Sequence, residues 1–404
     1  SRAALLTGRY PIRSGMAHNQ YRVLRAISTG GLPKEEVTLA ETLKSAGYAT
    51  ALIGKWHLGV WANDRPEHHP LAHGFDYHFG LMHSNDMNPS AGNPPKANAR
   101  VDQDAAWWNA PLFRGYELVD PKADQTQLTR RYTEEATKFI ASHKTQPFFL
   151  YFAPVAVHEL VTPSAETTGT SKAGPYGDFI HDLDRSVGRI LAALEKQNAL
   201  ENTLIIFTSD NGGVVNPGGK TGTNQLAMNA GLKINGALRG GKHDIWEGGF
   251  KVPFLVRWPG RVPAGTTSNE LIGIVDIFAT VAAVVGETKL DRTTTAPDSV
   301  NVLAAFTGPP NPQPLRRDLI LQSASGVYAI RSGPWKWIDG VPLAPKGKKA
   351  PAATGPKADQ FRPRLVNLLD DPAEKNDVAA AHPEIATRLA ETLRRHRAQG
   401  FSRD

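Results

Sequence analysis

Hydrophobic and polar positions alternate along this chain in blocks that predict helices and strands in turn. Apolar residues recur at helical spacing over 128–140 and 180–194, and each block is followed by a short apolar run, at 148–152 and 203–208. Short and fully apolar runs are typical of strands that are buried on both faces of a parallel sheet. The repeated order of helix and strand therefore predicts an α/β domain whose large, mostly parallel sheet lies between layers of helices.

A shorter helix and strand are predicted near the start of the chain. Thr38 and Glu41 stand at the spacing of a capping box, so we expect a helix that begins there and continues to Leu43. Gly47 suits the end of that helix, and the apolar segment 48–53 predicts the strand that follows. This pair adds a further strand to the same sheet.

The composition changes towards the end of the chain. A strand is predicted at 252–258 and a helix at 274–285, before a Pro- and Gly-rich linker at 308–314. We place a domain boundary at this linker, with a large α/β domain over 1–308 and a smaller α+β domain over 315–404. The smaller domain is expected to contain β-like pieces at 319–322, 327–331 and 335–338, and a helix from Pro383 to Gly400.

Composition and charge restrict the classes of function. With 404 residues and 40% hydrophobic content, the chain can bury one large core and a second, smaller one. The absence of Cys excludes disulfides and thiolate metal sites in this sequence. The net charge of +7 has no accompanying pattern of interleaved aromatic residues, so no nucleic acid partner is expected. No apolar run approaches the roughly eighteen residues of a membrane-spanning helix, so no membrane span is expected either.

The first residues predict that the natural amino terminus lies upstream. Ser1 and Arg2 are followed by a short apolar run, without an initiator Met and without the charged and then apolar pattern of a signal peptide. The sequence therefore leaves the cellular compartment undetermined.

The first candidate for chemistry is the pair Asp210 and Asn211. This pair directly follows the buried strand 203–208 and leads into a Gly-rich segment. Ligands of α/β sheets bind at the carboxyl ends of the strands, and a carboxylate beside an amide offers two hard oxygens suited to Ca²⁺ or Mg²⁺. The same residues also fit an ordinary Asp-Asn-Gly turn.

Further polar side chains are expected at the same edge of the sheet. Lys55 and His57 follow the strand at 48–53, and His158 ends the strand that we expect over 148–156. Lys242 lies in a second Gly-rich stretch. A Lys and a His two positions apart can be incidental, but two lysines, two histidines and a metal-binding pair together indicate a site for a tetrahedral dianion.

Several motifs together resemble one family. Residues 1–11, SRAALLTGRYP, resemble the tail of the type I sulfatase motif C-x-P-S-R-A-x-L-L-T-G-R, and 54–59 resembles the second motif of that family. The remaining motifs follow in the family's order: Asp210-Asn211, the Lys242 loop with Trp246-Glu247-Gly248-Gly249, Trp258-Pro259-Gly260, and the late stretch 365–374. The resemblance extends over essentially the whole chain and is closest to the arylsulfatase-like branch.

The resemblance implies an alkaline phosphatase-like fold and the hydrolysis of sulfate esters. The family's nucleophile is a Cys converted to formylglycine, four positions before Arg2 and hence upstream of residue 1. Asp210 and Asn211 would hold Ca²⁺, or with less support Mg²⁺, together with two aspartates further upstream. The chain as given is therefore expected to be inactive by itself.

The resemblance also assigns roles to individual residues. Arg2 would support the formylglycine, and Lys55 would contact both that group and the sulfate. His57 would be the base that helps to release sulfate. His158 and Lys242 would bind the sulfate on the side of the leaving group, with His158 as the candidate general acid.

Two local features concern the leaving group. The family often has Pro before and shortly after the histidine at position 158, whereas Val157 and Glu159 flank it here. The loop 83–87 resembles a substrate-pocket loop of arylsulfatase relatives, so Asn85 and Asp86 are candidates for substrate binding. A polar surface loop is the alternative interpretation of that segment.

Other functions stay open at this point. A phosphate or phosphonate monoester hydrolase of the same superfamily would use a similar anion site, and Thr instead of Cys or Ser four positions before Arg2 would favour it. A non-catalytic relative that only binds sulfated glycans is a third reading, against which the intact Lys55, His57 and Asp210 argue. The expected partner is a sulfated small molecule or glycan, whose leaving group is a sugar, a steroid or a phenol. Periplasmic or secreted localisation follows from the resemblance alone.

Overall fold

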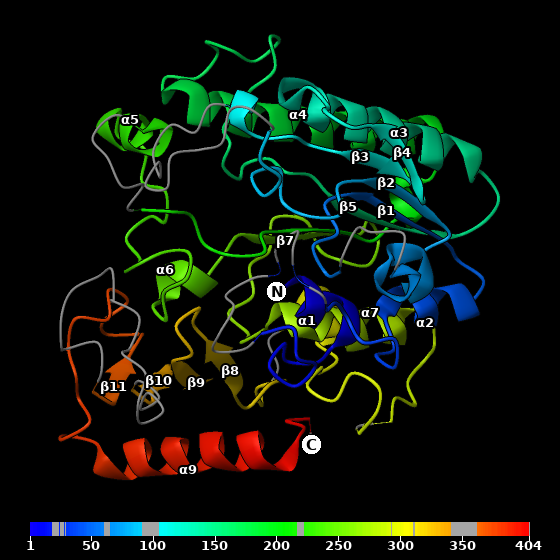
Figure 1. The fold of residues 1–404 in the computed structure, drawn as a ribbon. Helices are drawn as coiled ribbons and strands as arrows, with labels where there is room; N and C mark the ends of the chain where they lie inside the picture. The colour runs from blue at the N-terminus through cyan, green and yellow to red at the C-terminus, as the bar shows by residue number, and fades with distance from the viewer. Residues whose placement is uncertain are drawn as a thin grey trace.

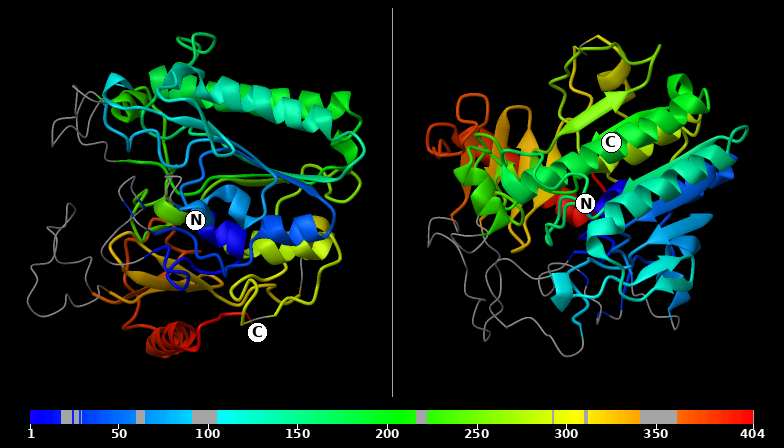
Figure 2. Two further views of the ribbon diagram at one scale, coloured as in Figure 1. Left: turned by 45° about the vertical axis from the view of Figure 1, so that its right-hand side comes forward. Right: turned by 90° about the horizontal axis from the view of Figure 1, so that it is seen from above.

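The computed structural model describes residues 1–17, 24, 28, 30–59, 65–90, 105–215, 222–291, 293–309, 312–340 and 362–403. In this part of the chain, a mixed sheet lies between two layers of helices, and a smaller antiparallel sheet with the last helix lies beyond one of these layers (Figure 1, Figure 2). This agrees with the predicted α/β architecture and its smaller α+β appendage.

The main sheet has five strands in the order β4-β3-β2-β1-β5. Strand β1 pairs in parallel with both β2 and β5, whereas β3 pairs antiparallel with β2 and β4. The parallel centre puts the carboxyl ends of β1, β2 and β5 at one edge. The strands are β1 Ala49–Gly54, β2 Tyr77–Gly80, β3 Leu112–Arg114, β4 Glu117–Asp120 and β5 Phe148–Ala153.

Helices cover both faces of this sheet (Figure 1). Helix α3 (Leu128–Ser142) packs on β1, β2 and β5, and α4 (Gly174–Lys196) packs on α3. The other layer contains α1 (Arg2–Thr7), α2 (Leu39–Ser45) and α7 (Ile277–Val284). The predicted capping box of α2 is confirmed, because the Thr38 N–H donates to Glu41 and the Glu41 N–H donates to the Thr38 hydroxyl.

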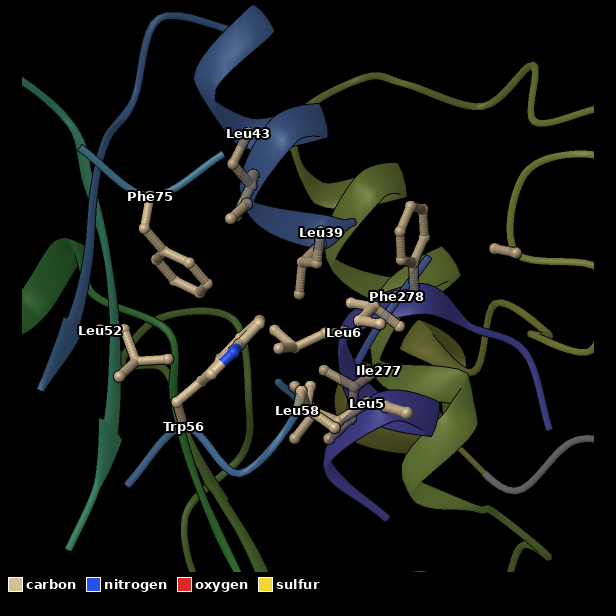
Figure 3. Packing of buried hydrophobic residues seen from close by; sticks show 14 of the residues in the cluster. Leu5, Leu6, Leu39, Leu43, Leu52, Trp56, Leu58, Phe75, Ile277 and Phe278 are labelled. Atoms are coloured by element: carbon tan, nitrogen blue, oxygen red, sulfur yellow. The ribbon is translucent and has the colours of Figure 1, made fainter. Parts of the chain in front are cut away.

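A buried core joins the second helical layer to the sheet. Trp56 is fully buried directly after β1 and packs among Leu6 of α1, Leu39 of α2 and Phe278 of α7 (Figure 3). Burial of a large aromatic side chain stabilises the fold by a few kcal/mol, on the order of 3. The position of Trp56 therefore fixes its neighbours Lys55 and His57, which bracket it in sequence.

Two predicted strands differ from the expected parallel pairing. Strands β6 (Ile205–Thr208) and β7 (Phe254–Arg257) pair antiparallel and form a two-stranded sheet of their own within the described residues. Periodicity cannot distinguish parallel from antiparallel partners, because both present the same short apolar run. The Gly-rich segment after β6 also contains a helix, α5 (Thr223–Asn229).

The C-terminal strands form a four-stranded antiparallel sheet in the order β11-β10-β9-β8, against which α9 (Pro383–Gln399) packs. The predicted pieces agree with β8 Leu319–Gln322, β9 Tyr328–Ser332 and β10 Trp335–Ile338, while β11 Arg364–Asn367 was not predicted as a strand. The domain boundary at 308–314 stays a prediction. The remaining helices are α6 Glu247–Phe250 and α8 Leu303–Thr307, and the 3₁₀ turns are η1 Pro66–His68, η2 Pro70–His73, η3 Ala105–Trp107, η4 Gln125–Gln127, η5 Leu200–Asn202 and η6 Ile274–Asp276. None of the helices in the described ranges is both long enough and apolar enough to span a bilayer.

Candidate active site

Lys55 and His57 extend the line of β1 beyond its end. The Lys55 N–H donates to Ala153 O at 2.7 Å, and the N–H groups of the next two residues donate to the segment after β2. Trp56 packs in the buried core, whereas Lys55 and His57 on either side of it line the cavity. Gly54 is required here, since its φ is 116° and a Cβ would lie 2.1 Å from Ala153 O.

Arg2 connects three elements at this edge. Its guanidinium donates to Lys55 O at 2.6 Å, and its Nε lies 3.3 Å from Asp210 Oδ2 after β6. Burial alone would lower the pKa of Arg2, but Tyr151 and Asp210 raise it above its ordinary value. Burial alone would raise the pKa of Asp210, but Arg2 and then Lys55 lower it to about 2. Both groups are therefore charged at neutral pH.

The pair Asp210 and Asn211 offers oxygens to a cation. The Asn211 amide nitrogen donates to Gly212 O at 3.0 Å, and its amide oxygen accepts no hydrogen bond from the described residues. An ionised carboxylate and an amide oxygen are hard ligands that fit Ca²⁺. In the described ranges, no group of three or more His, Cys, Asp or Glu side chains is arranged to hold a metal ion. The two residues would thus supply only part of a ligand set.

Lys242 and His158 meet across the cavity. The Lys242 ammonium lies 2.8 Å from His158 Nε2. An ammonium only donates, so Nε2 accepts and the ring proton is on Nδ1, which faces Glu159 O. Burial, then Lys55 and Lys242, lower the pKa of His158 to about 4. At neutral pH the His158 ring is therefore neutral. His158 itself lies in the loop beyond β5, which ends at Ala153 rather than at the predicted residue 156.

Asn235 holds the two Gly-rich loops together. Its amide oxygen accepts from the Gly213 N–H at 2.8 Å, and its amide nitrogen donates to Gly213 O and Gly240 O, both at 3.0 Å. The Lys242 N–H also donates to Gly213 O. These bonds fix the Lys242 loop beside the Asp210 loop. Sequence reasoning missed Asn235, because nothing in a single sequence marks one Asn of a long segment.

Lys55 is a buried ammonium with one neutral hydrogen-bond partner among the described residues. Its Nζ donates to Ser84 Oγ at 3.0 Å. Burial, followed by the charge of Arg2, lowers the pKa of Lys55 to about 7, although Asp210 and Asp86 oppose the shift. An anion at this position would restore the charge of Lys55 and be bound strongly. Ser84 was not predicted individually, although it lies inside the candidate loop 83–87.

The two candidate substrate-binding residues in this loop differ. Asn85 is 1% exposed, and its side chain is hydrogen bonded to Gln125 at 2.8 Å, so it anchors the loop. Asp86 lines the cavity, and its buried Oδ1 has no hydrogen-bond partner among the described residues. The charge of Asp86 acts on Lys55, His158 and Glu159. The geometry therefore favours Asp86 over Asn85 as a group that meets a ligand.

His57 is held as a neutral base. Its Nε2 lies 2.8 Å from Leu24 O, so Nε2 carries the proton and Nδ1 has the lone pair. Burial and then the charge of Lys55 lower its pKa well below the ordinary value. The backbone at His57 is left-handed, with φ of 60°. Residues in such strained conformations cluster at functional sites.

The structure thus gathers the residues that the sequence nominated. One continuous cavity is lined by all of the following: Arg2, Lys55, His57, Ser84, Asp86, His158, Asp210, Asn211 and Lys242. Three of these side chains are cationic and two are anionic, and the electrostatic coupling between Lys55, Lys242, His158 and Asp210 places them within reach of one ligand. This excess of buried positive charge suits a tetrahedral anion.

Comparison with known proteins agrees with this geometry. The Sulfatase family model matches residues 1–287. N-acetylgalactosamine-6-sulfatase of Canis lupus familiaris is 33% identical over 98% of this chain and 76% of its own length, and steryl-sulfatase of Mus musculus is 33% identical over 99% and 74%. A solved Bacteroides thetaiotaomicron structure from a locus for the metabolism of multiple glycosaminoglycans is 29% identical, with a TM-score of 0.76 over 98% of this chain and 88% of its own.

Proposed function

The chain belongs to the sulfatase family and is a sulfuric ester hydrolase, and from this premise we propose which of its residues act on the sulfate ester and which substrates it takes. The observation that carries the assignment is the convergence of Arg2, Lys55 and Lys242 on one cavity around Asp210. No described feature favours the phosphate and phosphonate esters or a purely binding function.

Lys55 and Lys242 bind the sulfate oxygens in this proposal. The Lys55 ammonium is buried, so its attraction for an anion is much stronger than in water, and the partly exposed Lys242 adds a second positive charge. Arg2 is already engaged by Lys55 O and Asp210, and it fixes the relative positions of β1 and β6 beneath the sulfate. Lys55 gains its full charge when the anion arrives, because the free cavity holds its pKa near 7.

The histidines move protons at opposite sides of the sulfate. His57 accepts a proton at Nδ1, since its Nε2 proton is held by Leu24 O. On the leaving-group side, the Lys242 and His158 pair carries one proton between Nζ and Nε2, and we assign this proton to the leaving oxygen. His158 alone is a poor acid at neutral pH, because its pKa is near 4 until an anion enters.

Two further groups are proposed from the resemblance. A formylglycine from the segment that precedes the run Ser1-Arg2 would supply the nucleophile, and Ca²⁺ held in part by Asp210 and Asn211 would add positive charge. Asp210 fits this use because it is ionised, and Asn211 fits because its amide oxygen accepts no hydrogen bond from the described residues. Residues 1–404 without that segment should not turn over substrate.

We propose a sulfated glycan as the substrate. A carboxylate oxygen that is buried without a donor, as at Asp86, is costly unless a ligand supplies one. Sugar leaving groups carry hydroxyls beside the ester, whereas simple phenols carry none. The matched N-acetylgalactosamine-6-sulfatase and the structure from the glycosaminoglycan locus support this class, although the steryl-sulfatase is equally similar in sequence.

Two organisational features complete the proposal. We propose that the catalytic domain covers 1–308 and that 315–404 is a separate domain, which the distinct sheet β8–β11 supports. Periplasmic or secreted localisation is proposed from the resemblance, and fractionation of the source cells would test it.

The test compares three variants of the full-length protein, including its upstream segment. His57→Ala should lower kcat by about 10²–10⁴ on any sulfate ester, while His181→Ala on the exposed face of α4 should not. Asp86→Asn should raise KM for a sulfated sugar and leave KM for a simple aryl sulfate unchanged. Equal effects of Asp86→Asn on both substrates would reject the glycan assignment, and normal turnover of His57→Ala would reject its role as a base.

A further inference from the structure

A buried cluster of four charges lies between the C-terminal sheet and the loop that carries Lys242. The fully buried Lys336 of β10 lies 3.0 Å from Glu247 Oε1 and 2.8 Å from Glu374 Oε1. Arg331 of β9 lies 3.0 Å from the second oxygen of Glu247. Two positive and two negative charges therefore balance, three of them buried and Arg331 partly exposed.

Glu374 holds both ends of the Lys242 loop. Its Oε2 accepts from the Glu247 N–H at 2.6 Å, and its carbonyl oxygen accepts from the Arg239 guanidinium at 2.5 Å. The Arg239 guanidinium also stacks on the ring of Trp246, 3.6 Å from its centre. Arg239 and Glu247 bracket the loop, with Lys242 between them. One residue of the C-terminal part thus closes this loop at its base.

The base of the loop also contacts the Asp210 segment. The Gly212 N–H donates to Gly249 O at 3.1 Å, and a Cβ on Gly212 would lie only 1.7 Å from Gly248 O. The backbones at the start of α6 and after β6 are therefore too close to admit even a Cβ between them. The segment that carries Asp210 therefore packs directly against the base of the Lys242 loop.

Stability alone does not explain this cluster. Burial raises the pKa of Glu374, although Lys336 and the Glu247 N–H favour its ionised form. Buried ion clusters are on average no more stabilising than apolar residues of the same volume, but they fix one arrangement of the groups around them. Such fixing matters at a reaction centre, where a displacement of about 1 Å can cost about 10² in rate.

We propose that Glu374 is a positioning residue: by closing the 239–247 loop at both ends, it holds Lys242 at His158 and makes the C-terminal sheet part of the catalytic machinery. This proposal rests on the proposed role of Lys242 at the sulfate. Glu374 contacts neither substrate nor reacting atoms, and it acts only through the loop.

The test uses Glu374→Ala in the full-length protein. We expect kcat/KM to fall by about 10- to 100-fold under conditions where the variant is folded, because the loop loses its anchor at the Glu247 N–H, while the bond from Arg239 to the backbone carbonyl of residue 374 remains. Glu374→Gln keeps an acceptor for the Glu247 N–H and should recover most of the activity. In the double variant with Lys242→Met, Glu374→Ala should cause no further loss, since both changes act through the same ammonium.

Arg316→Met is the matched control, because it breaks a buried ion pair outside this loop. It should lower stability but leave the kcat/KM of the folded enzyme unchanged. Hydrogen exchange should quicken in residues 239–249 of Glu374→Ala and not in those of Arg316→Met. If Glu374→Ala does not fold, Arg239→Met removes the other anchor at a partly exposed position and should give the same result.

Distinct outcomes separate this proposal from the proposed function. An unchanged kcat/KM in Glu374→Ala, or a further loss on top of Lys242→Met, would overturn the positioning role. A fully active Lys242→Met would show that the proposed role of Lys242 at the sulfate is wrong. If Glu374→Ala still quickened hydrogen exchange in residues 239–249, Glu374 would be a structural anchor of the loop only, and the positioning role would be overturned as well.

Discussion

Buried charges occur in two contrasting regions of this molecule. Arg316, which is 2% exposed, pairs with both oxygens of Asp276 and donates to the carbonyls of Asp298 and Asp318 at 2.6 and 2.9 Å. At the active site, Lys55 is 5% exposed and donates only to the Ser84 hydroxyl among the interactions of the described residues. The charge of Arg316 is therefore neutralised by a carboxylate and hydrogen bonded by carbonyls, whereas Lys55 has only a neutral hydroxyl partner among the described residues.

The pKa values express this difference. Burial alone would lower the pKa of Arg316, but Asp276 and its other partners raise it above the ordinary range. Burial and the neighbouring Arg2 lower the pKa of Lys55 to about 7. A buried charge with complete partners is maintained for the fold, whereas a buried cation without them is destabilising until a ligand arrives. The charges of Lys336, Arg331, Glu247 and Glu374 also compensate one another, as those of Arg316 and Asp276 do. Because these four residues border the loop of the active site, we assign a positioning role to Glu374.

The largest effect on stability is expected for the buried ion pair of Arg316 and Asp276. Arg316→Met leaves the Asp276 carboxylate buried without its partner and should destabilise the protein by about 3–5 kcal/mol. Urea unfolding would measure this loss, and the stabilisation by added inorganic sulfate should remain as in the wild type. A variant as stable as the wild type, or one that no longer responds to sulfate, would remove the contrast between the regions.

Lys55→Met should have a smaller effect of opposite sign. The pKa of Lys55 in the folded protein lies below its unfolded value, so the penalty for charging it is complete below pH 7 and disappears as pH rises towards 10.5. Without sulfate, the variant should be more stable than the wild type by about 1–4 kcal/mol at pH 6, with the gain shrinking above pH 7. Unfolding curves from pH 6 to pH 10 would measure it.

The exposed Lys138→Met on α3 is the control for that series and should show no such trend with pH. Addition of sulfate should reverse the order of stability, because only the wild type binds the anion with Lys55. A Lys55→Met variant that is less stable than the wild type at pH 6 would show that protein groups do compensate the charge of the Lys55 ammonium.

The smallest effect is expected for a surface pair. Arg257 and Glu201 lie 3.3 Å apart with both side chains largely exposed. Water and salt screen such pairs, so Glu201→Gln should change stability by about 0.5 kcal/mol or less. Thermal unfolding at low and high salt would check this, and a loss comparable to that of Arg316→Met would mean that burial is not what separates strong from weak pairs here.

The sequence by itself determined the element order and the nomination of the site. The apolar blocks predicted β1, α3, β5, α4 and β6 within a few residues, because burial imposes its periodicity directly on the chain. The motif order, through its resemblance to the sulfatase family, nominated Arg2, and the residue types at the predicted strand ends and in the Gly-rich loop nominated Lys55, His57 and Lys242 for an anion and Asp210 for a metal ion. Their individual catalytic roles remain predictions.

Only the tertiary structure decided how these residues are held. The antiparallel pairing of β6 with β7, the burial of Asn85 against Gln125 and the clamp by Glu374 all depend on contacts between segments far apart in sequence. Glu247 and Glu374 are 127 positions apart in the sequence, and no local pattern indicates their hydrogen bond. Local patterns record which face of an element is buried, but partner choice and charge matching are properties of the assembled fold, because they arise only when separate elements share one interior.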